Sequence, residues 1–205
     1  MLNVALAKGR LADSCAELFI RCGIRAGILK EETRKLVLET PDGKFRFFFV
    51  KPADVPTYVE YGIADIGIVG KDTLLEAGAD LYEMLDLGFE KCKLCVAGFA
   101  GRAPSRPLRV ATKYVNTARR LYASRGEDAE IIKLNGSIEL APLTGLSDVI
   151  FDIVQSGGTL RANGLSVLEE VFDISARLIA NKVSLKTKAA EILPLISAMK
   201  QYIGE

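Results

Sequence analysis

Short apolar segments alternate along the chain with segments in which apolar residues recur every three or four positions. This alternation is typical of an α/β protein with mostly parallel strands. The apolar segments that predict strands are residues 2–7, 36–39, 45–50, 64–70, 108–114, 129–135, 148–154 and 176–182. The segments that predict helices are residues 9–24, 53–62, 71–77, 116–126, 137–145 and 185–203. A further helix is expected from the small-residue turn at 156–159 to about Leu168.

The same pattern predicts two α/β lobes with a cleft between them. Residues 86–101 look like an extended crossover from a first lobe into a second, and the last helix is placed to return to the first. The expected lobes are therefore 1–90 with 182–205, and 91–181. Asn116 has the side chain of a good N-terminal cap for the first helix of the second lobe.

Charge and targeting signals narrow the class of protein. The chain has 27 basic and 26 acidic residues, a formal net charge of +1, so no overall field favours binding to nucleic acid or a membrane surface. No apolar stretch approaches the roughly 18 residues of a membrane span, and the start of the chain lacks a secretory signal. We therefore expect a cytoplasmic protein.

The four cysteines and the absence of histidine limit the possible chemistry. Cys92 and Cys95 have zinc-like spacing, but no second pair and no histidine completes a tetrahedral site, so reduced thiols in or near the core are expected. Without histidine there is no Ser-His-Asp or Cys-His machinery. Chemistry must use Asp, Glu, Lys or Arg, or depend on binding and charge stabilisation.

A candidate phosphate-binding loop follows the predicted strand 148–154, in the sequence Ser156-Gly157-Gly158-Thr159. The hydroxyls can bind an anion, and the glycines let backbone N–H groups approach it closely. A turn that leads into a helix directs further N–H groups at a ligand. Asp152 could bind sugar hydroxyls or Mg²⁺ through water. A plain strand-to-helix turn with a hydroxyl cap explains the same residues equally well.

The wider context of this loop resembles one family. Residues 139–165 combine Glu139, Gly145, Ser147, Asp148 and Asp152 with the loop, in the order of the signature of ATP phosphoribosyltransferases. Further stretches match that family in order: 5–11, 33–37, 53–72 and 109–116. The resemblance covers nearly the whole chain. It implies a type II periplasmic-binding-protein-like fold, two-lobed, with the active site in the inter-lobe cleft.

The resemblance also implies an activity. Enzymes of this family join N1 of the adenine ring of ATP to C1 of 5-phosphoribosyl diphosphate (PRPP), release pyrophosphate and require Mg²⁺; the reaction opens histidine biosynthesis. The chain length resembles the short form, which works with a regulatory subunit resembling histidyl-tRNA synthetase. A homodimer within a hetero-oligomer is expected on the same basis, with ATP and PRPP as ligands.

Site residues follow from the matched motifs. By resemblance, Arg10 and Arg34 would contact diphosphate and ATP phosphates and stabilise the departing pyrophosphate, with Lys8 as a third cation. Asp152 would bind the ribose hydroxyls, and Ser156, Gly157, Gly158 and Thr159 the 5-phosphate. Glu139 and Asp148 would contact ribose or Mg²⁺-bound water, or else cap helices. Tyr114 would stack on adenine or pack in the core. No direct protein ligand of the metal is expected.

Two other functions remain to be weighed. A solute-binding protein of the same fold would need export, and the chain shows no signal for it. A nucleobase phosphoribosyltransferase usually carries an acidic pair before its loop, whereas this chain has Phe151-Asp152.

Overall fold

In the computed structural model, which describes residues 1–31, 33–103 and 105–203, the chain folds into two units, each built on its own sheet. Unit 1 comprises Met1–Glu90 and Ser175–Glu205, and unit 2 comprises Lys91–Ile174. The first expected boundary, after residue 90, coincides with this division. The second is wrong, because residues 175–181 belong to unit 1. Their strand completes the sheet of unit 1, as described next.

Unit 1 is a six-stranded mixed sheet in the order β2-β3-β1-β4-β11-β5. The strands are β1 (Leu2–Ala7), β2 (Val37–Glu39), β3 (Phe45–Val50), β4 (Ile66–Gly70), β5 (Tyr82–Asp86) and β11 (Ala176–Ala180). β1 pairs in parallel with β3 and β4, as expected, but β11 runs antiparallel to both of its neighbours. β11 therefore returns from unit 2 to fill the gap between β4 and β5.

Helices cover both faces of this sheet. They are α1 (Arg10–Arg21), α2 (Val55–Glu60), α3 (Lys71–Ala77), α7 (Lys182–Thr187) and α8 (Ala189–Lys200), with short 3-10 turns at Ala26–Lys30 and Pro52–Asp54. On one face, Val4 and Leu6 of β1 pack with Phe19 of α1 and Met199 of α8. On the other face, Ala5 packs with α2. Alternate residues of one strand thus serve two cores.

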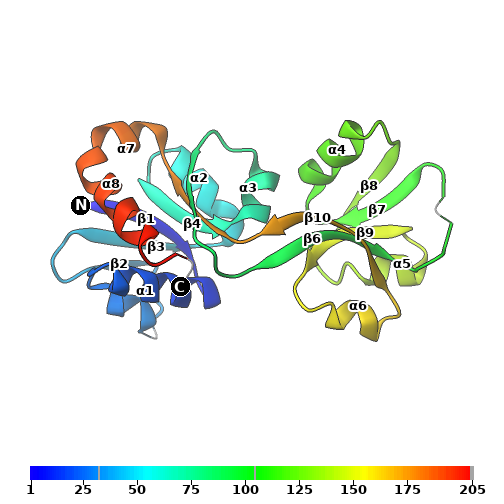
Figure 1. Cartoon of the computed structure of the whole chain (residues 1–205), viewed down its shortest axis with the longest axis horizontal. Coiled ribbons are helices and arrows are strands. Elements are labelled where there is room, and N and C mark those ends of the chain that lie inside the picture. Colours follow the sequence, from blue (N-terminus) through cyan, green and yellow to red (C-terminus); the bar gives the residue numbers. More distant parts are fainter. Residues whose placement is uncertain (32, 104, 204–205) are drawn as a thin grey trace. The chain divides into compact units, whose positions relative to one another are not determined.

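Unit 2 is a five-stranded sheet in the order β10-β6-β9-β7-β8. The strands are β6 (Cys92–Gly98), β7 (Leu108–Thr112), β8 (Ala129–Lys133), β9 (Val149–Val154) and β10 (Ser166–Ile174), and the helices are α4 (Val115–Ser124), α5 (Leu140–Thr144) and α6 (Gly158–Ala162). α4 lies on one side of the sheet and α6 on the other (Figure 1). Ile150 of β9 packs with Ala141 of α5 and Leu160 of α6.

Two local predictions in unit 2 are wrong. The helix expected to reach about Leu168 ends at Ala162, and residues 166–174 form β10, which pairs antiparallel with β6. Gly164 stops the helix, because its φ of 69° lies in the left-handed region. Asn116 is not a cap: α4 begins at Val115, one residue earlier.

The four cysteines are free thiols, and Cys15 and Cys95 are buried, as expected for core residues. Burial raises the pKa of the Cys95 thiol above its usual value, and the negative charge of Glu170 adds to this effect. No helix within the described ranges combines the length and apolar character needed to cross a membrane.

A buried carboxylate ties the end of the chain to the beginning. Asp65, 3% exposed, accepts hydrogen bonds from the Asn3 backbone N–H at 2.8 Å, the Ser184 hydroxyl at 2.7 Å and the Lys188 ammonium at 2.7 Å. These partners lie on β1, on α7 and just after α7. The carboxylate thus links two segments that are more than 180 residues apart.

We expect Asp65→Ala to lower the free energy of unfolding by about 3 kcal/mol or more, because it leaves the buried Ser184 hydroxyl and a partly buried ammonium without their carboxylate. Asp80→Ala is the matched control, since Asp80 pairs with Lys182 but has a 78% exposed side chain, and exposed pairs contribute little to stability. Urea unfolding followed by circular dichroism measures both. Equal losses in the two variants would show that the Asp65 network is not a main support of unit 1.

Candidate functional site

A cavity of about 270 Å³ lies in unit 2 where β9 leads into α6. Its wall includes Glu139, Asp152 and the whole candidate loop Ser156, Gly157, Gly158 and Thr159. The structure therefore brings together six of the residues singled out from the sequence. They come from three places in the chain: the residue before α5, the strand β9 and the turn after it.

The loop takes its form from glycine. Gly157 has φ 66° and ψ 12°, in the left-handed region that favours glycine, and α6 begins at the next residue. The first N–H groups of a helix have no acceptor within that helix. Here they belong to Gly158, Thr159 and Leu160, which all line the cavity. α6 has only five residues, so these N–H groups matter more for binding an anion than a helix dipole does.

Two carboxylates face the same cavity. Along β9, alternation places Asp152 on the same face as Ile150, the face covered by α5 and α6. Its side chain is 19% exposed. Glu139 immediately precedes α5 but makes no side-chain capping bond there. The cap suggested as an alternative role for Glu139 is therefore not formed, and its carboxylate is available to the cavity.

A cation that the sequence did not single out accompanies Asp152. The Lys113 ammonium lies 3.9 Å from the Asp152 carboxylate and 4.8 Å from the centroid of the Tyr114 ring. Lys113 directly follows β7, which pairs in parallel with β9. Lys113 could have been found from its position near the end of a predicted strand, because the carboxyl ends of parallel strands meet at one edge of a sheet. That inference, however, requires knowing that β7 and β9 are neighbours.

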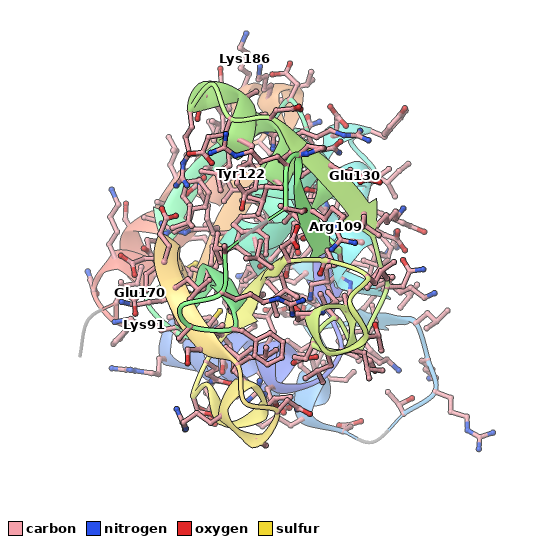
Figure 2. The ribbon with its side chains drawn as sticks, turned by 90° about the vertical axis from the view of Figure 1, so that its right-hand side faces the viewer. Lys91, Arg109, Tyr122, Glu130, Glu170 and Lys186 are labelled. Carbon is pink, nitrogen blue, oxygen red and sulfur yellow. The ribbon has the colours of Figure 1, made fainter. Side chains whose placement is uncertain are left out.

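Asp148 lies at the opposite end of β9 from the loop, just before the strand begins. Its carboxylate accepts from the Arg109 backbone N–H at 2.9 Å, from the Arg109 guanidinium at 3.2 Å and from the Ser105 hydroxyl. The Arg109 guanidinium also donates to the Gly145 carbonyl at 3.0 Å. In Figure 2, Arg109 is seen on β7, beside the strand that carries Glu130. The structure thus separates Asp148 from the loop and gives it partners of its own.

These partners set the acidity of Asp148. Burial alone raises its pKa, but the hydrogen bonds from Ser105 and Arg109 and the positive charge of Arg109 outweigh that effect and lower the pKa to about 2. Hydrogen bonding to the charged form is the deciding contribution. Asp148 is a stable anion that joins β7 to the start of β9.

Tyr114 is only 4% exposed. Its backbone N–H donates to the Thr112 hydroxyl at 2.8 Å, and its ring packs in unit 2 beneath the Lys113 ammonium. Of the two roles weighed for this residue, the structure favours core packing. So little exposed ring surface is a poor platform for stacking.

In unit 1, two of the predicted cations follow β1. The Lys8 ammonium donates to the Thr33 carbonyl at 3.2 Å and lies 5.3 Å from the centroid of the Phe49 ring. Lys8 lines a second cavity, of about 170 Å³, together with Gly9, Thr33 and other residues. Arg10 begins α1, has a 75% exposed side chain and forms a 3.7 Å ion pair with Glu90.

Arg34 is exposed and immediately follows Thr33, the acceptor of Lys8. The structure therefore brings the segment of Arg34 next to Lys8. Glu90, the partner of Arg10, was not singled out from the sequence. It has φ 52°, a left-handed backbone that is uncommon for residues other than glycine.

Comparison with known proteins shows which family this chain resembles. Residues 51–201 match the family model described as ATP phosphoribosyltransferase. A curated relative from Ruminiclostridium cellulolyticum, named ATP phosphoribosyltransferase, is 54% identical over 208 residues, covering 99% of this chain and 97% of the relative.

Solved structures agree. The chain is similar to one in the ATP phosphoribosyl transferase (HisG:HisZ) complex from Thermotoga maritima, with a TM-score of 0.85 and 36% identity over 99% of this chain and 98% of that one. A likeness to the periplasmic aliphatic sulphonate binding protein SsuA from Escherichia coli has a TM-score of 0.58 at 13% identity, covering 98% of this chain and 71% of that one. At that identity it shows the fold alone, which is the expected two-lobed periplasmic-binding-protein type.

We expect Asp148→Asn to destabilise the protein in a pH-dependent way. A carboxyl whose folded pKa is depressed from 3.8 to about 2 contributes about 2 kcal/mol above the unfolded pKa and loses it as the pH falls through the folded value. The difference from the unaltered protein should be full at pH 5 to 7 and roughly halved at pH 3. Denaturant titrations at these pH values measure it. A gap that does not change with pH would contradict the role given to Asp148.

Proposed function

Because the chain belongs to the ATP phosphoribosyltransferase family, we propose that the unit 2 cavity binds PRPP for transfer to ATP. The observation that carries this proposal is the convergence of Asp152, Glu139 and the Ser156–Thr159 loop on one cavity. The enzyme is a pentosyltransferase of histidine biosynthesis. The bond that forms joins N1 of adenine to C1 of the ribose, the bond that breaks joins C1 to the diphosphate, and pyrophosphate leaves.

The PRPP site is assigned by chemistry. A 5-phosphate accepts from the first N–H groups of α6 and from the hydroxyls of Ser156 and Thr159, since all these donors line the cavity. The Asp152 carboxylate accepts from the ribose hydroxyls. Glycine at 157 supports both assignments, because its backbone turns the loop towards the cavity. Asp148 is left out of this site and has a structural role.

The cations of unit 1 are proposed to bind the phosphates of the substrates and to stabilise the departing pyrophosphate. Arg10 and Arg34 are exposed, permanently charged and able to donate two parallel hydrogen bonds to phosphate oxygens. We assign them to the diphosphate and ATP phosphates, with Lys8 beside them. Because pyrophosphate leaves as an anion, stabilising its charge favours bond breaking without a proton donor. This suits a chain with no histidine.

Mg²⁺ is proposed to enter with the substrate. Within the ranges that the structure describes, no group of three or more His, Cys, Asp or Glu side chains could hold a metal ion. Mg²⁺ commonly uses one or two carboxylates together with substrate phosphates and water, and Glu139 and Asp152 supply two carboxylates to one cavity. When bound, the ion would neutralise charge on the diphosphate.

A second subunit is proposed as a partner. The similar Thermotoga maritima chain was solved in a complex named HisG:HisZ, and this chain covers nearly all of it. We propose a regulatory subunit resembling histidyl-tRNA synthetase in that place. The alternative of a solute-binding protein has fold similarity in its favour, at 13% identity, whereas relatives above 50% identity carry the transferase name.

The function is tested by mixing the chain and its partner subunit with ATP, PRPP and Mg²⁺. Formation of an N1-substituted adenine is followed by absorbance, and pyrophosphate release is measured in parallel. Both should rise together and depend on both substrates. If neither product forms with the partner present, the proposed function is wrong.

We expect Gly157→Ala to raise the Kd for PRPP about tenfold or more, an effect of roughly 1.4 kcal/mol. A Cβ at 157 would lie 3.1 Å from the Arg161 guanidinium, on a backbone with φ 66°, so the Arg161 side chain must move aside and the turn is crowded next to the cavity. Gly164→Ala is the matched control, because φ is 69° there and nothing lies within 4 Å. The two variants carry similar backbone strain. Calorimetry should therefore show weakened binding for Gly157→Ala alone, and equal binding by both would contradict the loop assignment.

A further inference from the structure

Lys113 is a charged residue beside the PRPP cavity that the proposed function does not use. β7 and β9 are parallel, with Val110 opposite Val149 and Ala111 opposite Ile150. The same register, continued by two residues, places Lys113 opposite Asp152. The 3.9 Å ion pair between their side chains is therefore a consequence of strand pairing.

The backbone that carries Lys113 is fixed to β9. The Thr112 hydroxyl donates to the Phe151 carbonyl at 2.6 Å and accepts from the Tyr114 backbone N–H at 2.8 Å. Both bonds are buried, and Thr112 itself is 0% exposed. Thr112 is thus fixed to the strand that carries Asp152, and Tyr114 is fixed to Thr112. Only the lysine side chain, which is 44% exposed, is left to move.

The position of Asp152 creates an electrostatic problem that Lys113 can solve. Asp152 shares its cavity with a loop that binds phosphate, so its carboxylate and the phosphates of PRPP repel each other across a short distance. Its side chain is only 19% exposed, and water therefore screens this repulsion weakly. An ammonium 3.9 Å from the carboxylate offsets this repulsion, so that the carboxylate can accept hydrogen bonds from ribose hydroxyls beside a bound phosphate.

We propose that Lys113 is a positioning residue for PRPP that acts through Asp152. This inference rests on the proposed function and assigns it Lys113, which lies in the matched stretch 109–116 but was given no role from the sequence. Lys113 holds the Asp152 carboxylate in place near the carboxyl end of β9. Its positive charge offsets the repulsion between that carboxylate and the phosphates of the substrate. The ring of Tyr114 supports the ammonium from the other side, at 4.8 Å.

The test compares Lys113→Met and Lys113→Arg in the complete enzyme, with its partner subunit. Methionine keeps the length and removes the charge, whereas arginine keeps the charge. We expect Lys113→Met to raise KM for PRPP about tenfold, because the repulsion between the Asp152 carboxylate and the substrate phosphates is then no longer offset. kcat and KM for ATP should change less than about threefold, and Lys113→Arg should stay within about threefold of the unaltered enzyme.

Lys133→Met is the matched control. Lys133 ends β8, the other neighbour of β7, and is also exposed. It lies opposite Thr112 in the register, one residue from Lys113 and on the other face of the sheet. Loss of this charge should leave KM for PRPP unchanged. An equal increase in both variants would mean that general charge attracts the substrate, which would overturn the specific role of Lys113.

A second measurement tests whether Lys113 acts through Asp152. Calorimetric binding of PRPP is measured for Lys113→Met, Asp152→Asn and the double variant. If Lys113 serves the carboxylate, removing its charge changes Kd less than about twofold once Asp152 is already neutral, because the two effects are coupled. A full tenfold effect in the Asp152→Asn background would refute the coupling.

The outcomes also separate this inference from the proposed function. If the unaltered enzyme neither binds PRPP nor forms product, the proposed function is wrong and this inference is wrong with it. If the unaltered enzyme works and Lys113→Met has the same KM for PRPP, only the role of Lys113 is wrong. If Lys113→Met instead changes kcat and both KM values equally, the residue is structural and the proposal is likewise refuted.

Discussion

The parallel pairing of β7 with β9 is the constraint on which the unit 2 site depends. It brings the carboxyl ends of both strands to one edge of the sheet, so that Lys113 and Asp152 meet there although 39 positions separate their strands in the chain. The same pairing places the amino ends at the opposite edge, where Arg109 binds Asp148. Each edge of the sheet thus carries one carboxylate beside one cation, but the surroundings of the two pairs differ.

The two aspartates of β9 show how surroundings decide function. Asp148 has its hydrogen bonds satisfied by Ser105 and Arg109, and its pKa falls to about 2. A carboxylate with its acceptor sites filled in this way has little capacity left for a ligand. Asp152 instead faces a cavity with Glu139 and a loop of N–H donors. Residue type and local sequence are similar for the two, and only the fold distinguishes the acid that is bonded to Ser105 and Arg109 from the acid that faces the cavity.

This contrast also explains which parts could be predicted from the sequence. Buried strands such as β1, β4 and β9 have long apolar runs, and α1 has a clear apolar face, so their patterns indicated them. The loop and its glycines could be identified because the chemistry lies within four consecutive residues. Family resemblance then connected the loop with distant motifs, which local physics could not do.

The failures have physical causes too. β10 lies at the edge of its sheet, eight of its nine residues are not buried, and its register is interrupted twice, so it lacks the alternation of a half-covered strand. β11 was assigned to the wrong lobe because its sequence is that of any buried strand, and its pairing with β4 and β5 is a long-range event. Lys113 was missed for the same reason, since its meaning depends on the neighbour that β7 acquires.

The charge arrangement suits a reaction that moves anions and has no histidine to move protons. Breaking the bond between C1 and the diphosphate leaves negative charge on a group that is already a polyanion. Arginine and lysine keep their charge across the working pH range, so their stabilisation of that group does not depend on a titrating partner. In the cavity of unit 2, the Asp152 carboxylate would be costly beside a bound phosphate unless a cation stood next to it, and the ion pair with Lys113 meets that requirement. Strand register thus sets where the charges of unit 2 stand, and with them the chemistry that its cavity can offer to an anion.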